Sequence, residues 1–591
     1  MTTFLDKVNF RRISSLAVAG LGPFAAAFAK NDRPDIVLLL ADDWGYPHAT
    51  VYGDPGVDSR VLDRIAEEGM LFTHAYSAAP HSSPSRASIL TGQYPHRLRD
   101  ACNLNCYFPG DLRVYPAELE KAGYETVFWH KGWGPGVWAE TGWEHNPAGH
   151  EVTDLVSYIE NAPEDKPICV WMGSRRPHRP YEMGSGEAHG FDPAAIAVSP
   201  DLPDSPDVRG DLADYYYNIQ LFQDECEAVI EALRKSGRLD NTLLIITGDN
   251  GDSFPRAKSN LYDMGCHVPM AVRWPGVIES GSVCDGFVNL MDLCATFYEV
   301  AGVEPPEKMD SRSLVPVFKG KKNGTRNEMY FDRERHTNTR PGGYGYPMRS
   351  VRTDDFLFIH NFHPERLPAG VDPVFGDTGN GPAKAYMSFH RDEYPAEIFE
   401  RAFGKRPEYE LYDLRTDPYC HKNVAEDKDY ASVRKTMEKK LLRWMKDTGD
   451  PRVDPLDMSF DTYPYVRRAM KIAVFDIDGC VNGPDGKPYP WVLEQMNLLR
   501  GRGVEVMQVN LPEELDSCVE VLDRIRKESG LSGREITVVS DACNGIISAK
   551  KAGLIPAGVT WGENDAREML MAGASYVLSD AEDLALCMDF L

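Results

Sequence analysis

The sequence predicts an α/β protein in which a central sheet is covered by helices on both faces. Continuous aliphatic runs at residues 36–40 and 243–247 are typical of strands buried on both faces. Similar runs occur at residues 126–129 and 168–172, and residues 214–235 have the spacing and length of a helix. Strands that alternate with helices favour a layered α/β architecture.

The length of 591 residues suggests three or four structural units, at about 150 residues per domain. We expect the main α/β domain at residues 30–324. From about residue 325 the chain becomes rich in Tyr, Pro, Gly and charge, and a short strand at 410–414 indicates a smaller α+β subdomain over 325–461. Residues 462–468 read as a linker, and a second alternating α/β series occupies 469–591.

The N-terminus has the pattern of an export signal. Arg11 and Arg12 precede an apolar run from residue 13 to 29, which ends in Ala-Phe-Ala. This pattern predicts a signal peptide at residues 1–29 and a periplasmic or extracellular protein. The run is short for a membrane span, although an uncleaved anchor is the alternative.

Composition restricts the possible functions. Lys and Arg number 64 against 90 Asp and Glu, which gives a net charge of −26. This balance argues against a general nucleic-acid binder, whereas an anionic substrate could still bind in a local basic pocket. Among twelve cysteines there is no Cys-x-x-Cys pair, so a thiolate zinc site is not expected. Cys102 and Cys106 could form a disulfide or remain buried thiols.

Polar side chains follow two of the predicted buried strands. Asp42 and Asp43 come after residues 36–40, and Asp249 and Asn250 come after residues 243–247. Ligands of open α/β sheets bind beyond the carboxyl ends of the strands. Four oxygen-bearing side chains that meet there would suit Ca²⁺ or Mg²⁺. Taken singly, however, each pair is more often a turn or a helix cap.

The run Ser-Ser-Pro-Ser-Arg-Ala-Ser-Ile-Leu-Thr-Gly at residues 82–92 closely resembles the signature of the sulfatase family, within the alkaline phosphatase superfamily. The likeness covers roughly residues 33–460 and implies an alkaline-phosphatase-like α/β/α sandwich. In this family the first Cys or Ser of the motif is oxidised to formylglycine, and that position is Ser82 here.

The resemblance assigns roles along the chain. It implies that a cation, Ca²⁺ or alternatively Mg²⁺, is held by Asp42, Asp43, Ser82, Asp249 and Asn250. It implies catalytic roles for Ser82, Arg86, Lys131, His178 and Lys258. The regions in which the family places substrate-recognition residues contain His267, Arg333, His336, Arg349 and Arg352.

The closest likeness within the family is to the heparan N-sulfoglucosamine sulfohydrolase branch, carried by Leu-Leu-Leu-Ala-Asp-Asp at 38–43 and Tyr-Pro-Met-Arg-Ser-Val at 346–351. Two departures concern the substrate. Trp133 stands where a leaving-group histidine is expected two residues after Lys131, and the neighbouring His130 would point elsewhere. His267 stands where many members carry Arg.

The family chemistry explains these residue types. Hydrated formylglycine attacks sulfur with one hydroxyl and expels sulfate with the other. Lys131, Lys258 and Arg86 would neutralise the sulfuryl oxygens, while His178 would handle protons at the leaving group. The implied partners are a sulfated oligo- or polysaccharide and a radical S-adenosylmethionine maturase, which serves the serine-type members. The oligomeric state stays open.

Two other functions fit the same residues. An unmodified Ser82 could serve a phosphomonoester, phosphodiester or phosphonate hydrolase. Since Trp133 replaces a histidine, a catalytically inactive carbohydrate-binding protein is the second alternative.

The C-terminal series contains Val-Phe-Asp-Ile-Asp-Gly at residues 474–479, which resembles the first motif of the haloacid dehalogenase (HAD) superfamily. The likeness implies a HAD-like Rossmannoid domain with Asp476 as nucleophile, Asp478 as acid/base, and Asp541 as a ligand for Mg²⁺. The expected Thr or Ser is replaced by Asn510, and no motif Lys is evident. We therefore expect a structural or assembly domain rather than an active phosphatase.

Overall fold

A computed structural model describes residues 33–321, 324–372, 374–466, 470–501, 503–562 and 564–578. The predicted signal peptide lies outside these residues. The largest sheet has nine strands in the order β10-β2-β9-β8-β1-β7-β4-β6, with β11 paired to β2. Its strands are β1 (Asp35–Ala41), β2 (Met70–Tyr76), β4 (Glu125–His130), β6 (His150–Glu151), β7 (Ile168–Gly173), β8 (Thr242–Gly248), β9 (His267–Arg273), β10 (Ser282–Cys284) and β11 (Val288–Asn289).

Strand β1 shows why the aliphatic runs form the centre of this sheet. It pairs in parallel with β7 on one side and β8 on the other, and all seven of its residues are buried. Val37 and Leu39 face one hydrophobic core, whereas Leu38 and Leu40 face a second. Because successive side chains of a strand point to opposite faces, a strand covered on both faces is apolar throughout.

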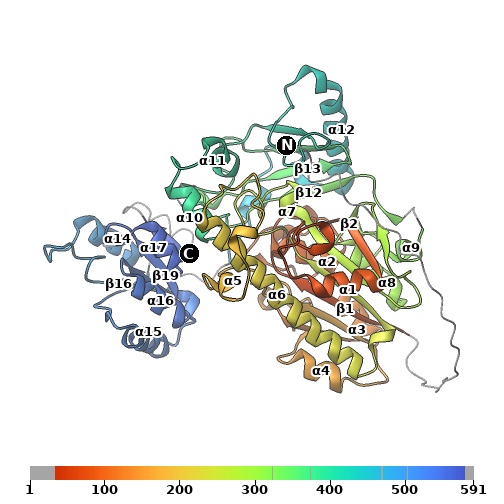
Figure 1. Cartoon of the computed structure of the whole chain (residues 1–591), viewed down its shortest axis with the longest axis horizontal. Helices are drawn as coiled ribbons and strands as arrows, with labels where there is room; N and C mark the ends of the chain where they lie inside the picture. Colours follow the sequence, from red (N-terminus) through yellow and green to blue (C-terminus); the bar gives the residue numbers. More distant parts are fainter. Residues whose placement is uncertain are drawn as a thin grey trace.

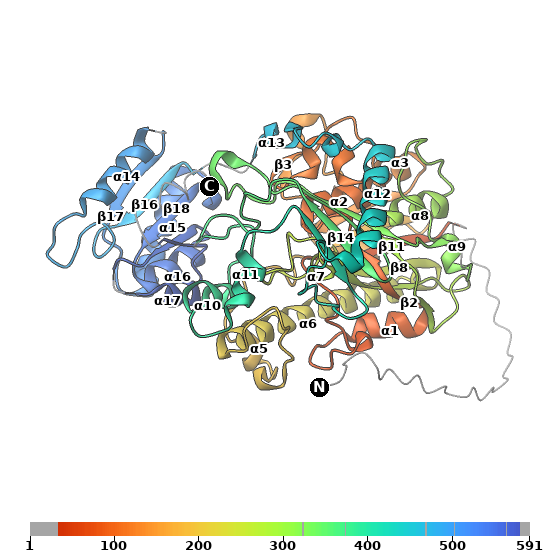
Figure 2. The ribbon, with the colours of Figure 1, turned by 90° about the horizontal axis from the view of Figure 1, so that it is seen from above.

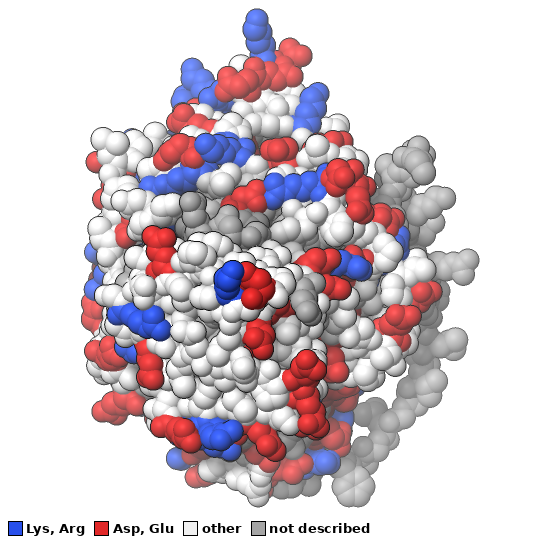
Figure 3. Space-filling view, turned by 90° about the vertical axis from the view of Figure 1, so that its left-hand side faces the viewer, with Lys and Arg blue, Asp and Glu red and all other residues white. Residues whose placement is uncertain are grey.

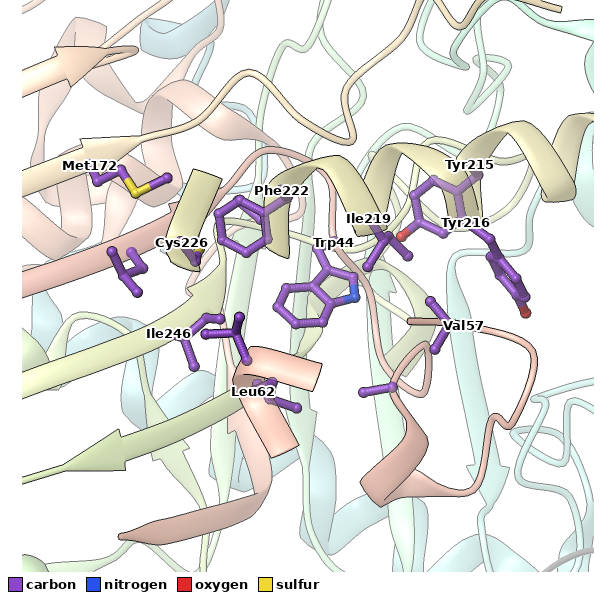
Figure 4. Packing of buried hydrophobic residues seen from close by; sticks show 14 of the residues in the cluster. Trp44, Val57, Leu62, Met172, Tyr215, Tyr216, Ile219, Phe222, Cys226 and Ile246 are labelled. Atoms are coloured by element: carbon purple, nitrogen blue, oxygen red, sulfur yellow. The ribbon is translucent and has the colours of Figure 1, made fainter. Parts of the chain in front are cut away.

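Helices cover the two faces. The core containing Val37 is closed by α1 (Arg60–Glu68), α4 (Leu155–Asn161) and α6 (Pro206–Lys235), and the opposite core by α2 (Ser82–Thr91), α3 (Tyr115–Lys121) and α8 (Asp292–Ala301). On the α6 side, Trp44 packs edge-on against Phe222 with ring centroids 5.6 Å apart (Figure 4). Helix α6 begins eight residues before the predicted 214, because Ser205 caps it through the Val208 N–H and Pro206 opens its first turn.

A second, antiparallel sheet has the order β12-β13-β14-β15. Its strands are β12 (Met329–Arg333), β13 (Met348–Arg352), β14 (Phe356–Asn361) and β15 (Tyr409–Asp413). Helix α12 (Ala431–Thr448) packs Leu441 and Trp444 against Val351 and Phe358 of this sheet. The α+β character predicted for this part of the chain agrees with these elements.

A third sheet is parallel throughout, with the order β17-β16-β18-β19-β20. It consists of β16 (Ile472–Asp476), β17 (Glu505–Val509), β18 (Ile536–Ser540), β19 (Ile555–Val559) and β20 (Tyr576–Leu578), and it is accompanied by α14 (Pro490–Gly501), α15 (Leu515–Ser529), α16 (Cys543–Lys551) and α17 (Ala566–Met571). Helix α17 lies beside α10 (Pro382–Phe389) (Figures 1 and 2). Arg567 Nε of α17 also bonds Asp207 Oδ2 of α6 at 3.0 Å.

The remaining elements are short. They are β3 (Cys106–Tyr107), β5 (Gly136–Val137), α5 (Ser185–Ala188), α7 (Asp263–Cys266), α9 (Val315–Phe318), α11 (Ala396–Phe403) and α13 (Ser459–Thr462). Cys102 and Cys106 are buried free thiols, and Cys106 Sγ donates to the Asn103 carbonyl at 2.8 Å. Of the two possibilities for these cysteines, the structure therefore shows the thiols. Within the described residues, no helix has the length and apolarity to cross a membrane.

Charge is distributed without a basic patch on the face at the left-hand side of Figure 1. That face mixes acidic and basic side chains around an uncharged area, with acidic groups in excess (Figure 3). The excess agrees with the net charge of −26.

Candidate active site

The polar residues that follow β1 and β8 meet at one edge of the main sheet. The two strands are parallel neighbours, so their carboxyl ends lie side by side. Asp43 adopts a left-handed conformation, with φ of 70°, and its N–H donates to Asp249 Oδ1 at 3.0 Å. Asn250 Nδ2 donates to Asp43 Oδ1 at 2.8 Å. The structure thus brings together the two pairs that the sequence predicted to converge.

Ser82 joins this cluster from the N-terminus of α2. All ten residues of that helix are buried, and Gly92 ends it with φ of 70°. Ser82 Oγ lies 2.9 Å from Asp42 Oδ1 and 3.3 Å from Asn250 Oδ1. The unpaired N–H groups of a helix N-terminus attract negative charge, so Ser82 occupies a position suited to an anionic substrate.

Three cations balance the three carboxylates of the cluster. Lys131 Nζ lies 2.6 Å from Asp42 Oδ2, and Lys258 Nζ lies 2.6 Å from Asp43 Oδ1. The third pair joins Arg86 Nε to Asp249 Oδ2 at 2.8 Å. Because the formal charges cancel, any divalent cation added to the cluster leaves a net positive site that favours a bound anion.

Burial and pairing set the protonation of these groups. Burial raises the pKa of Asp42, but the charges of Lys131, His178 and Arg86 outweigh it and leave the pKa well below the usual value. For Lys258, burial lowers the pKa, and the attraction of Asp43 and Asp42 raises it above the usual value. The pKa of Asp249 is raised, chiefly by burial, although Arg86 opposes the shift.

The oxygen atoms around Ser82 fit a hard cation. A hydroxyl has one proton, so Ser82 can donate fully to only one of Asp42 Oδ1 and Asn250 Oδ1. Asp42 Oδ1 also accepts from Lys131 Nζ at 2.7 Å, so the oxygen left without a donor among the described residues is Asn250 Oδ1, which is buried, and this is costly. Carboxylate and amide oxygens are the ligands that Ca²⁺ and Mg²⁺ take. Asp42, Asp43, Asp249 and Asn250 therefore suit such an ion, with Ser82 beside them.

His178 lies at the open side of the cluster. Its side chain is 42% exposed, and Nε2 is 3.8 Å from Asp43 Oδ2. Nδ1 is 2.5 Å from the Arg179 carbonyl, to which only an N–H can donate, so Nε2 is the nitrogen that faces the cluster. A group in this place can exchange protons with a molecule entering from solvent.

Trp133 lies behind the helix that carries Ser82 rather than in the cluster. Its Nε1 donates to the Ser83 carbonyl at 3.1 Å, and its ring packs edge-on against Phe108. An indole has no proton to exchange near neutral pH. The neighbouring His130 is exposed and its ring is tilted against that of Trp129, so it does not replace the missing histidine.

Most of the predicted substrate-binding residues are engaged in buried structural contacts. Arg349 is fully buried, with ion pairs to Asp450 at 2.6 Å and Glu334 at 2.8 Å. The buried side chains of Arg333 and Arg352 pair with Asp377 and Asp263 in the same way. Since their charges are already compensated inside the protein, these contacts do not support the substrate-facing role expected for the three arginines.

The two predicted histidines are placed differently from each other. His267 is stacked between Tyr46 and Tyr76, and its Nε2 is 3.0 Å from the Thr73 carbonyl, so its contacts are structural. His336 instead stacks on His81, the residue before Ser82, with centroids 5.1 Å apart. Of the five predicted substrate-binding residues, only His336 is therefore linked by these contacts to the segment that contains His81 and Ser82.

His81 and Asp377 did not emerge from the sequence. His81 is fully buried, and neither of its ring nitrogens has a hydrogen-bond partner among the described residues. Burial, together with His336 and Arg333, holds the pKa of His81 well below its usual value. Asp377 holds Arg333 and lies 3.6 Å from His336 Nδ1. The position of His81 directly before the motif was the one signal that could have pointed to it.

The third sheet has a carboxylate group at an equivalent position, after β16 and β18. Asp476 accepts from the Leu511 N–H at 3.2 Å and from the Ser540 hydroxyl at 2.9 Å, both neutral donors. Burial raises the pKa of Asp476 to about 6, and the charges of Asp541 and Asp478 add to the shift. Lys527 lies on α15 and pairs with Asp523, so it does not serve Asp476.

Two family models match the chain. Residues 34–303 match the sulfatase family, and residues 256–367 match the C-terminal region of N-sulphoglucosamine sulphohydrolase. An ulvan-active sulfatase of Formosa agariphila is 29% identical over 71% of this chain and 82% of its own length. N-sulphoglucosamine sulphohydrolase of Homo sapiens is 27% identical over 71% of this chain and 92% of its own length.

Solved structures share the fold. The structure of a protein in complex with its substrate D-glucosamine-2-N,6-O-disulfate has a TM-score of 0.54 and 20% identity, covering 72% of this chain and 99% of that one. Phosphonate monoester hydrolase of Agrobacterium radiobacter has a TM-score of 0.52 and 18% identity, covering 70% of this chain and 96% of that one. Residues 34–303 therefore match the sulfatase family, and the named relatives and the Ser82 cluster agree with that match.

Proposed function

We propose that this protein removes sulfate from carbohydrates, using a formylglycine formed from Ser82. The observation that carries the proposal is the surroundings of Ser82, whose Oγ lies 2.9 Å from Asp42 at the N-terminus of a buried helix. Three cations within the same cluster provide the positive charge that a sulfuryl group requires. Relatives named as sulfatases of sulfated carbohydrates support this choice of substrate class.

The position of each side chain in the cluster suggests its role in the reaction. Lys131 and Lys258 each hold a carboxylate and present an ammonium to the space beside Ser82, where they would stabilise charge on the sulfuryl oxygens. Arg86 contributes through Nη2, which has no hydrogen-bond partner within the described part of the chain. His178 Nε2, on the exposed side, would deliver a proton to the leaving oxygen.

Two groups would complete the site. A divalent cation, which we expect to be Ca²⁺, would be held by Asp42, Asp43, Asp249 and Asn250 and would lower the pKa of an oxygen nucleophile. Formylglycine at position 82 would supply that nucleophile when hydrated. The all-oxygen ligand set argues for Ca²⁺ or Mg²⁺ over zinc.

The preferred substrate is inferred to be a sulfated amino sugar or a uronate-containing glycan. This inference rests on the similarity to N-sulphoglucosamine sulphohydrolase, in both the catalytic region and residues 256–367. His81, the residue before Ser82, and His336, which stacks on His81, are the side chains whose replacement should alter substrate preference. Sulfate release from O-sulfated and N-sulfated glucosamine would decide between a sulfatase and a sulfamidase preference.

The central test follows the modification of Ser82. Co-expression with a radical S-adenosylmethionine maturase should lower the mass of the Ser82 peptide by about 2 Da, through loss of two hydrogens, and should raise sulfate release strongly. Protein that releases sulfate at full rate with Ser82 shown to be unmodified would contradict the proposal.

A second candidate function is hydrolysis of phosphate or phosphonate esters by unmodified Ser82. The similar fold of a phosphonate monoester hydrolase is compatible with it. Aryl phosphonate turnover by unmodified protein, with aryl sulfate turnover absent, would favour this candidate. Tight glycan binding without turnover by modified protein would instead identify an inactive binding protein.

For residues 470–578 we infer a HAD-like domain that does not take part in sulfate release. The parallel strand order, in which β16 lies between β17 and β18, and the carboxylates Asp476, Asp478 and Asp541 support the likeness. Asn510 and the absence of a nearby motif lysine in the sequence argue against phosphoryl transfer, and a bound Mg²⁺ there is a further possibility to test. Asp476→Asn should leave sulfate release unchanged, and loss of a phosphatase activity in this variant would refute the inference.

Export is proposed from the N-terminal pattern alone. Cleavage after Ala29 in a secreting host, detected by N-terminal sequencing, would support it, and an intact N-terminus in the cytoplasmic fraction would oppose it.

A further inference from the structure

A second group of metal-binding side chains lies outside the Ser82 cluster, where α3 meets β6 at the end of the main sheet. It consists of Glu120, His145 and His150, and the atoms that each could offer to a metal lie within 4.8 Å of one another. His150 Nε2 is 3.0 Å from Glu120 Oε1, and His145 Nε2 is 3.8 Å from Glu120 Oε2. The two imidazole rings are 4.0 Å apart between centroids.

A backbone hydrogen bond on the side away from Glu120 fixes the orientation of the His145 ring. Its Nδ1 lies 3.0 Å from the Asn146 carbonyl, which can only accept, so Nδ1 carries the proton. In the neutral ring, Nε2 is then unprotonated, and its lone pair faces the carboxylate oxygen Oε2 of Glu120. Two facing acceptors repel each other unless a cation or a second proton lies between them. A histidine that donates its other nitrogen to a carbonyl is the usual arrangement of a metal ligand.

The loop at residues 145–149, which leads from His145 to His150 in β6, is anchored by hydrogen bonds. Asn146 is buried, and its Oδ1 accepts from the Trp133 N–H at 2.9 Å and from the Ala148 N–H at 3.0 Å. Its carbonyl also accepts from the Gly149 N–H, at 2.9 Å. His150 follows in β6, which pairs with β4. The histidines are thus placed by backbone contacts rather than by flexible segments, which reduces the entropy lost when a ligand binds.

The distances suit a small tetrahedral ion. Zinc binds His nitrogen and carboxylate oxygen at about 2.0–2.2 Å, which by tetrahedral geometry separates neighbouring ligand atoms by roughly 3.3 Å. His150 Nε2 is 3.0 Å from Glu120 Oε1 and His145 Nε2 is 3.8 Å from Glu120 Oε2, so the two separations, each to a different oxygen, lie on either side of that value. The side chains of Glu120, His145 and His150 are 42%, 26% and 54% exposed, so water can reach the remaining coordination position.

We propose that Glu120, His145 and His150 form a binding site for Zn²⁺ or a similar borderline divalent ion, separate from the catalytic cluster. Two imidazoles and one carboxylate select such ions, whereas the four oxygen donors beside Ser82 select a hard ion. The protein would then carry two sites of different chemical preference. The ion would link α3 to the edge strand β6 and would restrain the loop at residues 145–149 between its two histidine ligands.

The test uses the full chain saturated with Ca²⁺, so that the oxygen site is filled before Zn²⁺ is added in a calorimetric titration. We expect one Zn²⁺ to bind per chain with micromolar or better affinity, and at least a tenfold loss in both His145→Gln and His150→Gln. His390→Gln is the matched control, because His390 pairs with Glu393 on the surface without a second histidine. It should bind Zn²⁺ as the native protein does.

A second measurement identifies the ligands. Co²⁺ added in place of Zn²⁺ should give the intense visible absorption of a tetrahedral ion, and Glu120→Gln should weaken that signal. If His145→Gln and His150→Gln bind Zn²⁺ as tightly as the native protein, the ion binds elsewhere and the proposal is wrong. Failure of the native protein to bind Zn²⁺ would also overturn it, and would leave a shared proton as the link between His145 and Glu120.

Discussion

The mixed main sheet and the parallel third sheet of this molecule each end in a group of three aspartates, and the two groups have opposite electrostatic settings. After β1, Asp42 contacts the partly buried Lys131 and Asp43 contacts the buried Lys258, and the pKa of Asp42 falls well below its usual value despite burial. After β16, Asp476 is met by a hydroxyl and a backbone N–H, and burial raises its pKa to about 6. The topology of a parallel sheet is enough to gather carboxylates, whereas the cations must come from other elements.

The origin of those cations explains the difference. Lys131 follows β4, Lys258 lies in the loop after β8, and Arg86 comes from α2, so three separate segments must converge on the ends of β1 and β8. In the C-terminal sheet, the lysine considered from the sequence, Lys527, is on α15 and pairs with Asp523 instead. A site able to stabilise a transferring sulfuryl or phosphoryl group requires both sets of residues.

The largest effect is expected from Asp249→Ala. This change removes an oxygen ligand and leaves the buried Arg86 without its 2.8 Å partner. Ca²⁺ binding measured by calorimetry and sulfate release should both be lost. Asp541→Ala provides the comparison in the other sheet and should affect neither measurement. Native Ca²⁺ affinity in Asp249→Ala would show that the ion binds elsewhere.

Arg349→Ala should affect stability rather than chemistry. The side chain is fully buried between Asp450 and Glu334, and removal of one partner from a buried ion pair costs about 3–5 kcal/mol. We expect a loss of that size in the free energy of unfolding, measured in urea. The kcat/KM of the protein that remains folded should be unchanged, and a large fall in it would return Arg349 to the substrate-binding residues.

Lys258→Ala should lower kcat/KM of the modified enzyme about 10²–10³-fold, the typical effect of losing one group that stabilises charge in the transition state. Lys527→Ala is the matched control, since its lysine lies on the surface of α15 and should leave the rate unchanged. Equal rates for Lys258→Ala and the native enzyme would remove the distinction drawn between the two sheets.

The smallest effects concern the free energy of unfolding and its dependence on pH, measured in the presence of a chelator. We expect opposite signs for Asp476→Asn and Asp42→Asn. The pKa of Asp476 is raised from 3.8 to about 6, so its ionisation destabilises the fold as the pH rises through that range. Asp476→Asn should therefore stabilise the protein at pH 7, by about 1–3 kcal/mol at 1.36 kcal/mol per pKa unit.

Asp42→Asn should do the reverse. Its lowered pKa contributes stability that is present above the unfolded pKa of about 3.9 and is lost as the pH falls through the lower folded value. The variant should be less stable than the native protein at pH 7, and the difference should shrink in acid. Urea midpoints at pH 4 and pH 7 would test both variants, and shifts of the same sign would contradict the comparison.

The sequence was sufficient to predict the elements that depend on local patterns. The buried strands at 36–40, 126–129, 168–172 and 243–247 all lie within strands of the main sheet, since apolar runs of that length are typical of strands covered on both faces. The convergence of Asp42, Asp43, Asp249 and Asn250 followed from the rule for carboxyl ends of parallel strands.

The substrate side of the site could not be predicted in this way. Arg333, Arg349 and Arg352 have the residue type that binds sulfate, but their partners Asp377, Asp450 and Asp263 lie 44 to 101 residues away along the chain. Whether an arginine faces a ligand or a buried carboxylate depends on such distant contacts. The same holds for His81, whose burial against His336 joins segments 255 residues apart (336 − 81).

The burial of α2 has a consequence for biosynthesis. Ser82 is 1% exposed, and the nine residues after it are also buried, so no enzyme can enclose this segment in the folded protein. The oxidation of Ser82 that we propose must then compete in time with folding. A chain that folds first retains its serine for the lifetime of the native state. The fraction of active molecules in a preparation should therefore increase when folding is slowed or the maturase is more abundant, and substitutions far from Ser82 that change only the folding rate should alter the specific activity.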